Sequence, residues 1–239
     1  MQSLGVIVAR GGSKRFPRKM LSKLAGAPLI SYMGRAAAKS RLDRTVLSTD
    51  DSEIAQLGLD CGIDVPFRRP AELATDFVTN DRVLMHAIDW IEQNERRRYD
   101  VVVLLQPTAP FTTAGDIDGC LEALRTTSAN CCFAATSVTE QPHWMFVPQD
   151  NGEVDLMIPG LLSGDRQHTQ KLPRYVLPAG GVWAVRITAL REHGRIYSAP
   201  LRTVVVEPHR AVDIDTEFDL VVAEAVAKHY GALVLERAD

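Results

Sequence analysis

The sequence LGVIVARGGSKRFPRK, residues 4–19, joins a short apolar run to a basic segment that contains glycine. The apolar run at 4–9 has the length and composition of a β-strand. The ten residues after it hold two glycines and five cationic side chains. Open α/β sheets bind ligands at the carboxyl ends of parallel strands, where glycine lets backbone N–H groups approach an anion. The stretch therefore predicts an α/β sheet whose first loop binds a polyphosphate through charge-assisted hydrogen bonds.

This basic loop has a second interpretation, as a solvated surface segment. Residues 9–19 match neither the GxxxxGK[ST] pattern of a P-loop nor the GxGxxG pattern of a dinucleotide-binding fold. The position directly after a strand favours phosphate binding over plain solvation.

The rest of the chain alternates strand-like runs with amphipathic stretches, which is the pattern of parallel βαβ units. Val101–Leu105 is an uninterrupted apolar run, typical of a central strand that is covered on both faces. We therefore predict an α/β fold with a mostly parallel open sheet and helices on both faces. The other predicted strands are 45–48, 133–138 and 181–185, and the predicted helices are 28–40, from Asp50 or Asp51 to Leu59, 81–93, 113–124 and 216–230.

The alternation breaks over residues 139–175, which hold four prolines and three glycines. A loop of this length is uncommon in a compact domain unless it has a function or makes an interface. Its apolar side chains lack the periodicity that would bury them locally, and such exposed segments mark interfaces. We predict one domain over 1–239, with an insertion over 139–175 that reaches the partner in a two-fold homodimer. These apolar residues are Trp144, Met145, Phe146, Met157, Leu161 and Leu162.

Composition argues against several classes of protein. The chain has 239 residues, of which 46% are hydrophobic, enough for one sizeable core. Its net charge of −3 argues against a general binder of nucleic acid or of anionic membranes. No apolar run reaches the length of a membrane span, and the first is too short for a signal-peptide core. The four cysteines lack metal-ligand spacing, so we expect reduced thiols in a cytoplasmic protein.

A pair of carboxylates lies near the other end of the chain, in the segment VDIDT at 212–216. Asp213 and Asp215 are two apart, so in an extended segment both side chains point to the same side. Two carboxylates held close together repel one another, and a divalent cation offsets that repulsion; carboxylates and substrate phosphates are the usual ligands of Mg²⁺. In the alternative interpretation, Asp215 or Thr216 only caps the following helix, with Asp219 completing a capping box. The two interpretations are compatible.

Six segments together resemble the acylneuraminate (CMP-sialic acid) cytidylyltransferases. The resemblance covers nearly the whole chain, and the segments follow the family's order. It implies a nucleotide-diphospho-sugar transferase-like fold, CTP and an acidic nine-carbon sugar as substrates, a requirement for Mg²⁺, and a dimer. The segments are ARGGSKRFPRK (9–19), LSTDDSEIA (47–55), PFRRPAELATD (66–76), VVLLQPTAPF (102–111), KLPRY (171–175) and DIDT (213–216).

The resemblance assigns the basic loop to the CTP phosphates. Arg10, Ser13, Lys14 and Lys19 match the positions that hold them, and Gly12 matches the position that packs near the base.

Four further positions match family motifs. Arg69 corresponds to the position near the cytosine and Gln106 to the glutamine that touches the sugar, while Asp213 and Asp215 correspond to the metal-binding pair. Taken alone, Arg69 could be a surface ion-pair arginine, and Gln106 could satisfy the backbone of a loop.

The substrate carries a carboxylate, so the sugar pocket needs a cation. Arg166 in the insertion is our candidate, with Lys171 and Arg174 as alternatives. Tyr175 and Trp183 could form an apolar wall for the N-acyl group, although an aromatic residue beside a glycine pair is more often core or interface.

The chain also departs from the family pattern. Met20 stands where the family has asparagine, and Thr112 stands where it often has arginine. PAGGVW at 178–183 replaces the family's Asn-Gly-Ala-Ile-Tyr, which affects Ala179 and indicates a different sugar pocket. GSKRFPRK and TAPF resemble the pseudaminic acid branch, so the exact sugar stays open.

The reaction implied is attack of the anomeric hydroxyl on the α-phosphorus of CTP, with pyrophosphate leaving. Fixed cations and Mg²⁺ would stabilise the charge that develops on the phosphate oxygens, and Arg10, Lys14 and Lys19 are the residues expected to do so. Asp213 or Asp215 would hold the metal and could help to deprotonate the hydroxyl. Two rivals are a metal-dependent glycosyltransferase that consumes a nucleotide sugar and a catalytically degenerate homologue that only binds nucleotide.

Overall fold

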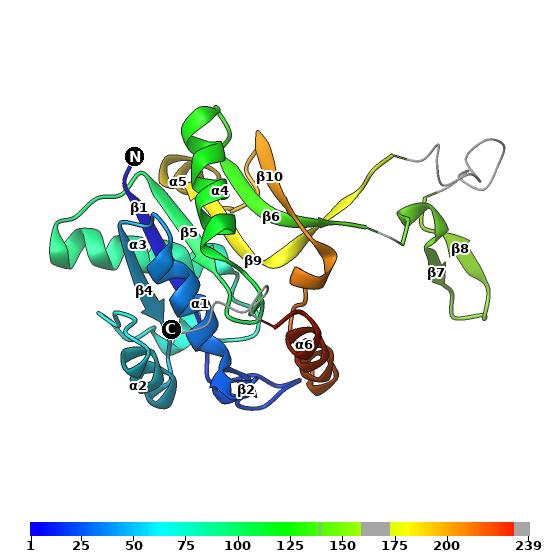
Figure 1. Ribbon diagram of the computed structural model, residues 1–239. Helices are drawn as coiled ribbons and strands as arrows, with labels where there is room; N and C mark the ends of the chain where they lie inside the picture. The colour runs from blue at the N-terminus through cyan, green and yellow to red at the C-terminus, as the bar shows by residue number, and fades with distance from the viewer. Residues whose placement is uncertain (139, 159–172, 232–239) are drawn as a thin grey trace.

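The computed structural model describes residues 1–138, 140–158 and 173–231 (Figure 1). Its strands are β1 (Ser3–Val8), β2 (Lys23–Leu24), β3 (Ala27–Pro28), β4 (Arg44–Ser48), β5 (Val101–Leu105), β6 (Cys131–Ser137), β7 (Phe146–Pro148), β8 (Val154–Leu156), β9 (Val176–Arg186) and β10 (Leu201–Val206). Its α-helices are α1 (Leu29–Lys39), α2 (Ser52–Asp60), α3 (Asn80–Glu95), α4 (Ala114–Thr126), α5 (Ile187–His193) and α6 (Glu217–Tyr230). The short 3-10 helices within these residues are η1 (Lys19–Leu21), η2 (Ala71–Leu73), η3 (Pro142–Trp144) and η6 (Pro208–Arg210).

The centre of the molecule is a six-stranded sheet in the order β10-β6-β9-β5-β1-β4. Strands β4, β1 and β5 run parallel, as do β6 and β10, and β9 lies antiparallel between β5 and β6. The prediction of a mostly parallel sheet is confirmed, with β9 as its one reversed strand. Because β1 and β5 are neighbours, the loops after their carboxyl ends lie side by side.

Helices cover both faces of the sheet, as predicted. Alternate residues of β5 point to opposite faces: Val103 packs in the cluster with α1, α2 and α4, and Leu104 packs in the cluster with α3 and α5. All five residues of β5 are buried, which explains its uninterrupted apolar run.

A third, smaller core attaches α6 to the segment after β1. Phe16 and Leu24 from that segment pack with Ile214 and with the α6 residues Ala223 and Ala227. The segment after β1 and the region of α6 therefore pack together, which holds the basic loop and the acidic segment close to one another.

Besides the short strands β2, β3, β7 and β8, the sequence analysis missed one helix and one strand of the central region, and it shortened β9. It named neither α5 nor β10, and it began β9 at residue 181 rather than at 176. The first half of β9 contains Pro178 and two glycines, which are uncommon inside strands and so weaken its sequence signal. At this place the register of β9 with β6 shifts between Phe133 and Ala135. Strand β10, with the sequence LRTVVV, lies at the sheet edge with mostly exposed side chains; its three consecutive valines favour a strand, but the sequence analysis did not assign one there.

The described part of the insertion forms a hairpin, β7 and β8, that stands away from the sheet (Figure 1). Its apolar side chains are exposed, among them Trp144, Phe146 and Met157. Leu161 and Leu162 lie outside the described residues. Among the helices that the structure describes, none combines the length and apolar character needed to cross a bilayer.

Candidate active site

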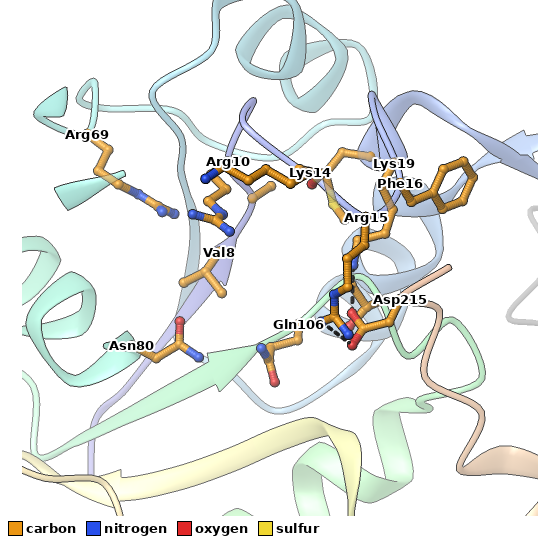
Figure 2. A pocket seen from close by; sticks show the side chains of 14 residues that line it. Val8, Arg10, Lys14, Arg15, Phe16, Lys19, Arg69, Asn80, Gln106 and Asp215 are labelled. Carbon is orange, nitrogen blue, oxygen red and sulfur yellow. Dashed lines mark hydrogen bonds and ion pairs between the residues drawn. The ribbon is translucent and has the colours of Figure 1, made fainter. Parts of the chain in front are cut away.

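A polar pocket opens at the carboxyl ends of β1 and β5 (Figure 2). Its lining comes from the end of β1, the basic loop, η1, the start of α3 and the turn after β5. The lining residues are Val8, Ala9, Arg10, Ser13, Lys14, Arg15, Phe16, Lys19, Met20, Arg69, Asn80, Gln106, Thr108 and Asp215.

The basic loop is fixed to the protein at its start. The Gly11 backbone N–H donates to the Asp50 carboxylate at 3.1 Å, so it is already occupied. A Cβ added at Gly11 would lie 2.6 Å from the Asp51 carboxylate, which explains why glycine is needed there. Asp51 meanwhile caps α2 by accepting from the N–H groups of Glu53 and Ile54. The sequence left Asp50 and Asp51 as alternative caps, and the structure gives each a separate task.

Four cations of the loop converge on two carboxylates. Arg10 and Lys14 both contact Asp76, at 2.8 and 2.5 Å. On the other side of the pocket, Asp215 accepts from two more cations, as the dashed lines in Figure 2 show.

The Asp215 contacts are made by Arg15 Nη2 at 2.8 Å and by Lys19 Nζ at 3.0 Å. The Lys19 side chain is only 11% exposed, whereas that of Arg15 is 72% exposed. Lys19 is therefore the cation that the pocket holds most firmly. Arg18, the fifth cation of the loop, turns to Glu53 and does not line the pocket.

The acidic segment is positioned by its neighbours in the chain. Thr216 and Asp219 form the capping box of α6, which leaves the Asp215 side chain for the pocket. Ile214 is fully buried, and its N–H donates to the Thr108 carbonyl at 2.8 Å, which anchors the segment to the turn after β5. Capping and placement of the aspartates in a pocket are thus compatible, because different residues do the two tasks.

Two more contacts constrain this segment. Gly180 has a φ of +79°, and a Cβ there would lie 3.0 Å from the Asp213 Cγ, so the glycine makes room for this carboxylate. Just upstream, Arg210 donates to the buried Asp116 carboxylate and to Thr113 Oγ1, which ties the segment to the start of α4.

The two aspartates have opposite pKa shifts. Burial raises the pKa of Asp213, and the charge of Asp215 raises it further. A hydrogen bond from Thr108 acts in the opposite direction but does not reverse the shift. Asp213 is exposed to solvent as a residue, so this burial is that of a carboxylate with protein atoms packed close around it. Burial also acts to raise the pKa of Asp215, but hydrogen bonds and charge from Lys19 and Arg15 outweigh it, and the net shift is downward.

Arg69 is a buried cation on the pocket wall opposite Asp215 (Figure 2). Its Nε donates to Ser48 Oγ and its Nη2 to the Ser48 carbonyl. Burial lowers the pKa of Arg69 to about 10, although Asp50 acts to raise it. No carboxylate within the described ranges forms an ion pair with it, so this guanidinium suits a polar or anionic ligand atom.

Two carboxamides lie on the lower wall in Figure 2, those of Gln106 and Asn80. The Gln106 N–H donates to the Gly181 carbonyl at 3.0 Å, so backbone bonding fixes its place at the end of β5. Among the described residues, the Gln106 side chain makes no hydrogen bond to a loop backbone, so the alternative interpretation finds no support there.

The pocket gathers most of the predicted site residues, which are Arg10, Ser13, Lys14, Lys19, Arg69, Gln106 and Asp215. Asp213 adjoins them, since its carboxylate accepts a hydrogen bond from Thr108. Gly12 is exposed in the loop but is absent from the pocket lining.

Apart from Gln106, the residues predicted to contact the sugar do not line this pocket within the described part of the chain. Tyr175 lies at the base of the hairpin, with its ring 5.5 Å from that of His143, and does not line this pocket. The suggestion that Trp183 walls the pocket is wrong: Trp183 is buried in the core with α3 and donates to Tyr197. Arg166 and Lys171 lie outside the described residues, and Arg174 is exposed.

Three polar residues that line the pocket were not selected from the sequence: Arg15, Asn80 and Thr108. Asp76, which pairs with two of the lining cations, was not selected either. Arg15 belongs to the basic loop, and its spacing gave no reason to choose it. Asn80 begins α3, where asparagine normally signals a cap. Asp76 ends the quoted segment at 66–76, but only the fold brings it to Arg10.

The positions that depart from the family pattern are packed into the protein. Met20 is buried and contributes an apolar surface to the pocket lining. Thr112 and Ala179 are also buried, and a Cβ at Gly181 would lie only 2.0 Å from Thr112 Oγ1. Thr112 and Gly181 therefore fit one another.

Comparison with known proteins finds one family across nearly the whole chain. The sequence pattern of the cytidylyltransferase family matches residues 4–230. The chain is 33% identical to the pseudaminic acid cytidylyltransferase of Campylobacter jejuni over 234 residues, which cover 95% of this chain and 97% of that protein. It is 32% identical to the CMP-N,N'-diacetyllegionaminic acid synthase of Legionella pneumophila over 228 residues, which cover 94% and 95%.

Among solved structures, CMP:2-keto-3-deoxy-manno-octonic acid synthetase complexed with CTP superimposes with a TM-score of 0.68. The match covers 96% of this chain and 99% of that one at 18% identity. At this identity the likeness concerns the fold, and it agrees with the nucleotidyltransferase-like α/β architecture seen here.

Proposed function

This chain belongs to the cytidylyltransferase family, and on that premise we propose that it transfers CMP from CTP to the anomeric hydroxyl of a nonulosonic (sialic-type) acid, with release of pyrophosphate. Relatives named for pseudaminic and legionaminic acids support an acidic nine-carbon sugar as acceptor. Their similar identities, 33% and 32%, do not select one sugar.

One observation carries the proposal: Lys19 and Asp215 meet at 3.0 Å inside a pocket that the basic loop also lines. A triphosphate has enough oxygens to accept hydrogen bonds from several cations at once. Four cations of the loop line this pocket. A sugar nucleotide or a neutral sugar would leave part of this charge unmatched. The pocket therefore favours a free triphosphate over the substrate of a glycosyltransferase.

The loop cations act where charge develops during transfer. As the anomeric oxygen attacks the α-phosphorus, the bond to the pyrophosphate oxygen breaks and negative charge accumulates on the leaving group. Arg10, Lys14 and Lys19 hold the phosphates and stabilise that charge. Lys19, with 11% of its side chain exposed, is the least screened by water and should contribute most.

We propose that Asp213 and Asp215 hold Mg²⁺ together with the substrate phosphates. The donor set fits this ion, because both groups are carboxylates and burial, together with the charge of Asp215, raises the pKa of Asp213. No set of three or more potential ligands among histidine, cysteine, aspartate and glutamate occurs in the described ranges, so phosphate and water would complete the coordination. When bound, the ion supplies electrostatic stabilisation of the phosphate oxygens.

Arg15 contacts Asp215 Oδ2 and Lys19 contacts Asp215 Oδ1. Arg15 is exposed, so its departure toward the phosphates would free Oδ2 for Mg²⁺ while Lys19 stays on Oδ1. The pairs seen here thus define the cationic wall of the pocket before nucleotide enters.

We assign the remaining contacts as follows. Arg69 takes the cytosine, since it is a buried donor with no ion-pair partner in the described chain, and Gln106 takes the sugar. Ser13 adds a hydroxyl to the phosphate site, and Gly12 keeps the loop open beside it. Arg166 and Tyr175 stay proposals for the sugar, and Tyr175 could reach a site only through a partner protomer, because the hairpin beside it stands away from this pocket.

We also propose a homodimer formed by the hairpin. The exposed apolar side chains Trp144, Phe146 and Val154 support it, since such a surface normally packs against another protein. The four free cysteines suit the reducing cytoplasm, where we place the enzyme.

The proposed reaction is tested by following pyrophosphate release. The protein is incubated with Mg²⁺, one of the four nucleoside triphosphates, and pseudaminic, legionaminic or N-acetylneuraminic acid. We expect release with CTP and at least one of these acids, and formation of the matching CMP-sugar. Tight CTP binding without release on any acid would support the degenerate homologue and contradict the proposed activity.

A further inference from the structure

Asp76 is an acidic residue that pairs with Arg10 and Lys14, two of the cations that line the pocket. It follows η2 in the chain and was not part of the site expected from sequence. One of its carboxylate oxygens lies 2.8 Å from Arg10 Nη2, and the other lies 2.5 Å from Lys14 Nζ. Both oxygens are therefore used, one on each cation.

These two cations are among those assigned to the triphosphate in the proposed function. A carboxylate that bridges them offers two anionic oxygens with a spacing similar to that of two oxygens on one phosphate group. While Arg10 and Lys14 contact Asp76, those same N–H groups cannot donate fully to phosphate. Asp76 and a phosphate ligand thus compete for the same pair of side chains.

The competition is easily reversed, because the pairs are exposed. The side chains of Asp76 and Arg10 are 32% and 33% exposed, and that of Lys14 is 83% exposed. Ion pairs of this kind contribute little in water, so exchange with an incoming phosphate costs little. Hydrogen bonds from Lys14 and Arg10 lower the pKa of Asp76, so the group stays ionised at neutral pH.

We propose that Asp76 is a counter-anion for Arg10 and Lys14. Between turnovers it holds both cations in place, and after transfer it competes with pyrophosphate for them, so that the product dissociates. This inference rests on the proposed function, and it adds a residue that speeds release rather than the transfer itself. No bond is formed or broken at Asp76; only ion-pair partners exchange.

The test compares pyrophosphate binding by the wild type and by Asp76→Asn, measured by titration calorimetry. Asparagine keeps the size of the side chain and removes its charge. We expect Asp76→Asn to bind pyrophosphate about 3- to 10-fold more tightly, the range that one or two exposed ion pairs can supply. Pyrophosphate should also inhibit turnover at correspondingly lower concentration. Asp76→Ser provides a second neutral variant if the first folds poorly.

Glu53→Gln is the matched control. Glu53 also pairs with a cation of the basic loop, Arg18, at 2.6 Å, but neither residue lines the pocket. Its substitution removes one negative charge from the same region and should leave pyrophosphate affinity unchanged.

Unchanged or weaker pyrophosphate binding in both Asp76 variants, with CTP turnover intact in the wild type, would overturn the role of Asp76 alone. Equal tightening in Glu53→Gln would also overturn it, because net charge would then explain the effect. A wild type that neither binds pyrophosphate nor turns over CTP would remove the proposed function and this inference with it.

Discussion

Lys19 and Asp215 are 196 positions apart in the chain, yet the Lys19 ammonium lies 3.0 Å from the Asp215 carboxylate. The contact exists because the basic loop follows β1, while α6 packs through Ala223 and Ala227 against the same small core as Phe16. Opposite charges from the two ends of the described chain thus share one pocket. This arrangement lets one polyphosphate meet cations and carboxylates at the same time.

The first prediction concerns Lys19. Lys19→Met removes a cation that is only 11% exposed, so we expect CTP turnover to fall about 100- to 1000-fold, as it does when a preorganised charge donor is lost. Arg18→Met is the control, because Arg18 is the adjacent residue in the loop but points to Glu53. Turnover by the control should stay within about twofold. Equal losses in both variants would show that loop folding, rather than the Lys19 charge, limits activity.

The second prediction concerns Gly180. Gly180→Ala places a Cβ 3.0 Å from Asp213 Cγ at a φ of +79°. We expect the free energy of unfolding to fall by about 1–3 kcal/mol. Turnover should fall about 10- to 100-fold, because Asp213 is displaced.

Gly62→Ala separates backbone strain from this displacement. Gly62 has a φ of +76° and no atom within 4 Å of an added Cβ. Urea titration should show a loss of about 1 kcal/mol, with turnover per folded molecule preserved. Full activity in Gly180→Ala would contradict the placement of Asp213 in the working site.

The third prediction is a pH dependence of stability, measured without metal. Burial raises the pKa of Asp213 above its ordinary 3.8, so the native state binds the proton more tightly and the ionised group destabilises the fold as pH rises past that value. Asp213→Asn should therefore be more stable than the wild type at neutral pH. The difference should shrink as pH falls toward about 4.

Asp219→Asn should show the opposite sign. The hydrogen bond from Thr216 lowers the pKa of Asp219, so its ionised form stabilises the protein above 3.8 and that stability is lost on acidification. This variant should be less stable at neutral pH and approach the wild type in acid. Chemical denaturation at both pH values checks the pair, and a loss of stability at neutral pH in Asp213→Asn would be incompatible with the Asp213 assignment.

The fourth prediction concerns the hairpin. Phe146 is 48% exposed on β7, and Phe146→Glu places a charge in the proposed dimer contact. We expect light scattering to show the variant as a monomer and the wild type as a dimer. Leu59→Glu, on α2 at 52% exposure, should remain a dimer. A wild type that is monomeric and fully active would remove the proposed dimer.

Helices and strands could be predicted from the sequence where burial of one or both faces requires a regular pattern of apolar residues. The helix predicted at 216–230 was found at Glu217–Tyr230 with Thr216 as its cap, because a capping box and apolar spacing mark it locally. Strand β5 was found at the predicted residues, since a strand buried on both faces has no polar positions. Strand β10 was missed although its three consecutive valines favour a strand, and its place at the sheet edge depends on pairing with β6.

The site was predictable in part for the same kind of reason. Clustered charges such as Arg10 and Lys14 are visible in sequence as a departure from an apolar pattern. Asp76 is not visible in this way, because its role depends on contacts with Arg10 and Lys14, which lie 66 and 62 positions earlier in the chain. Trp183 lies in the strand predicted at 181–185, and its side chain is buried in the core, which is the alternative that the sequence left open beside a role in the sugar pocket.

The most direct test of a shared phosphate site is a crystal structure with CTP and Mn²⁺, with the metal located by its anomalous signal. We expect the triphosphate between Arg10, Lys14 and Lys19, and the metal between that triphosphate and the carboxylates of Asp213 and Asp215. Nucleotide bound elsewhere, with the Lys19–Asp215 pair intact and no anomalous peak beside it, would contradict the account.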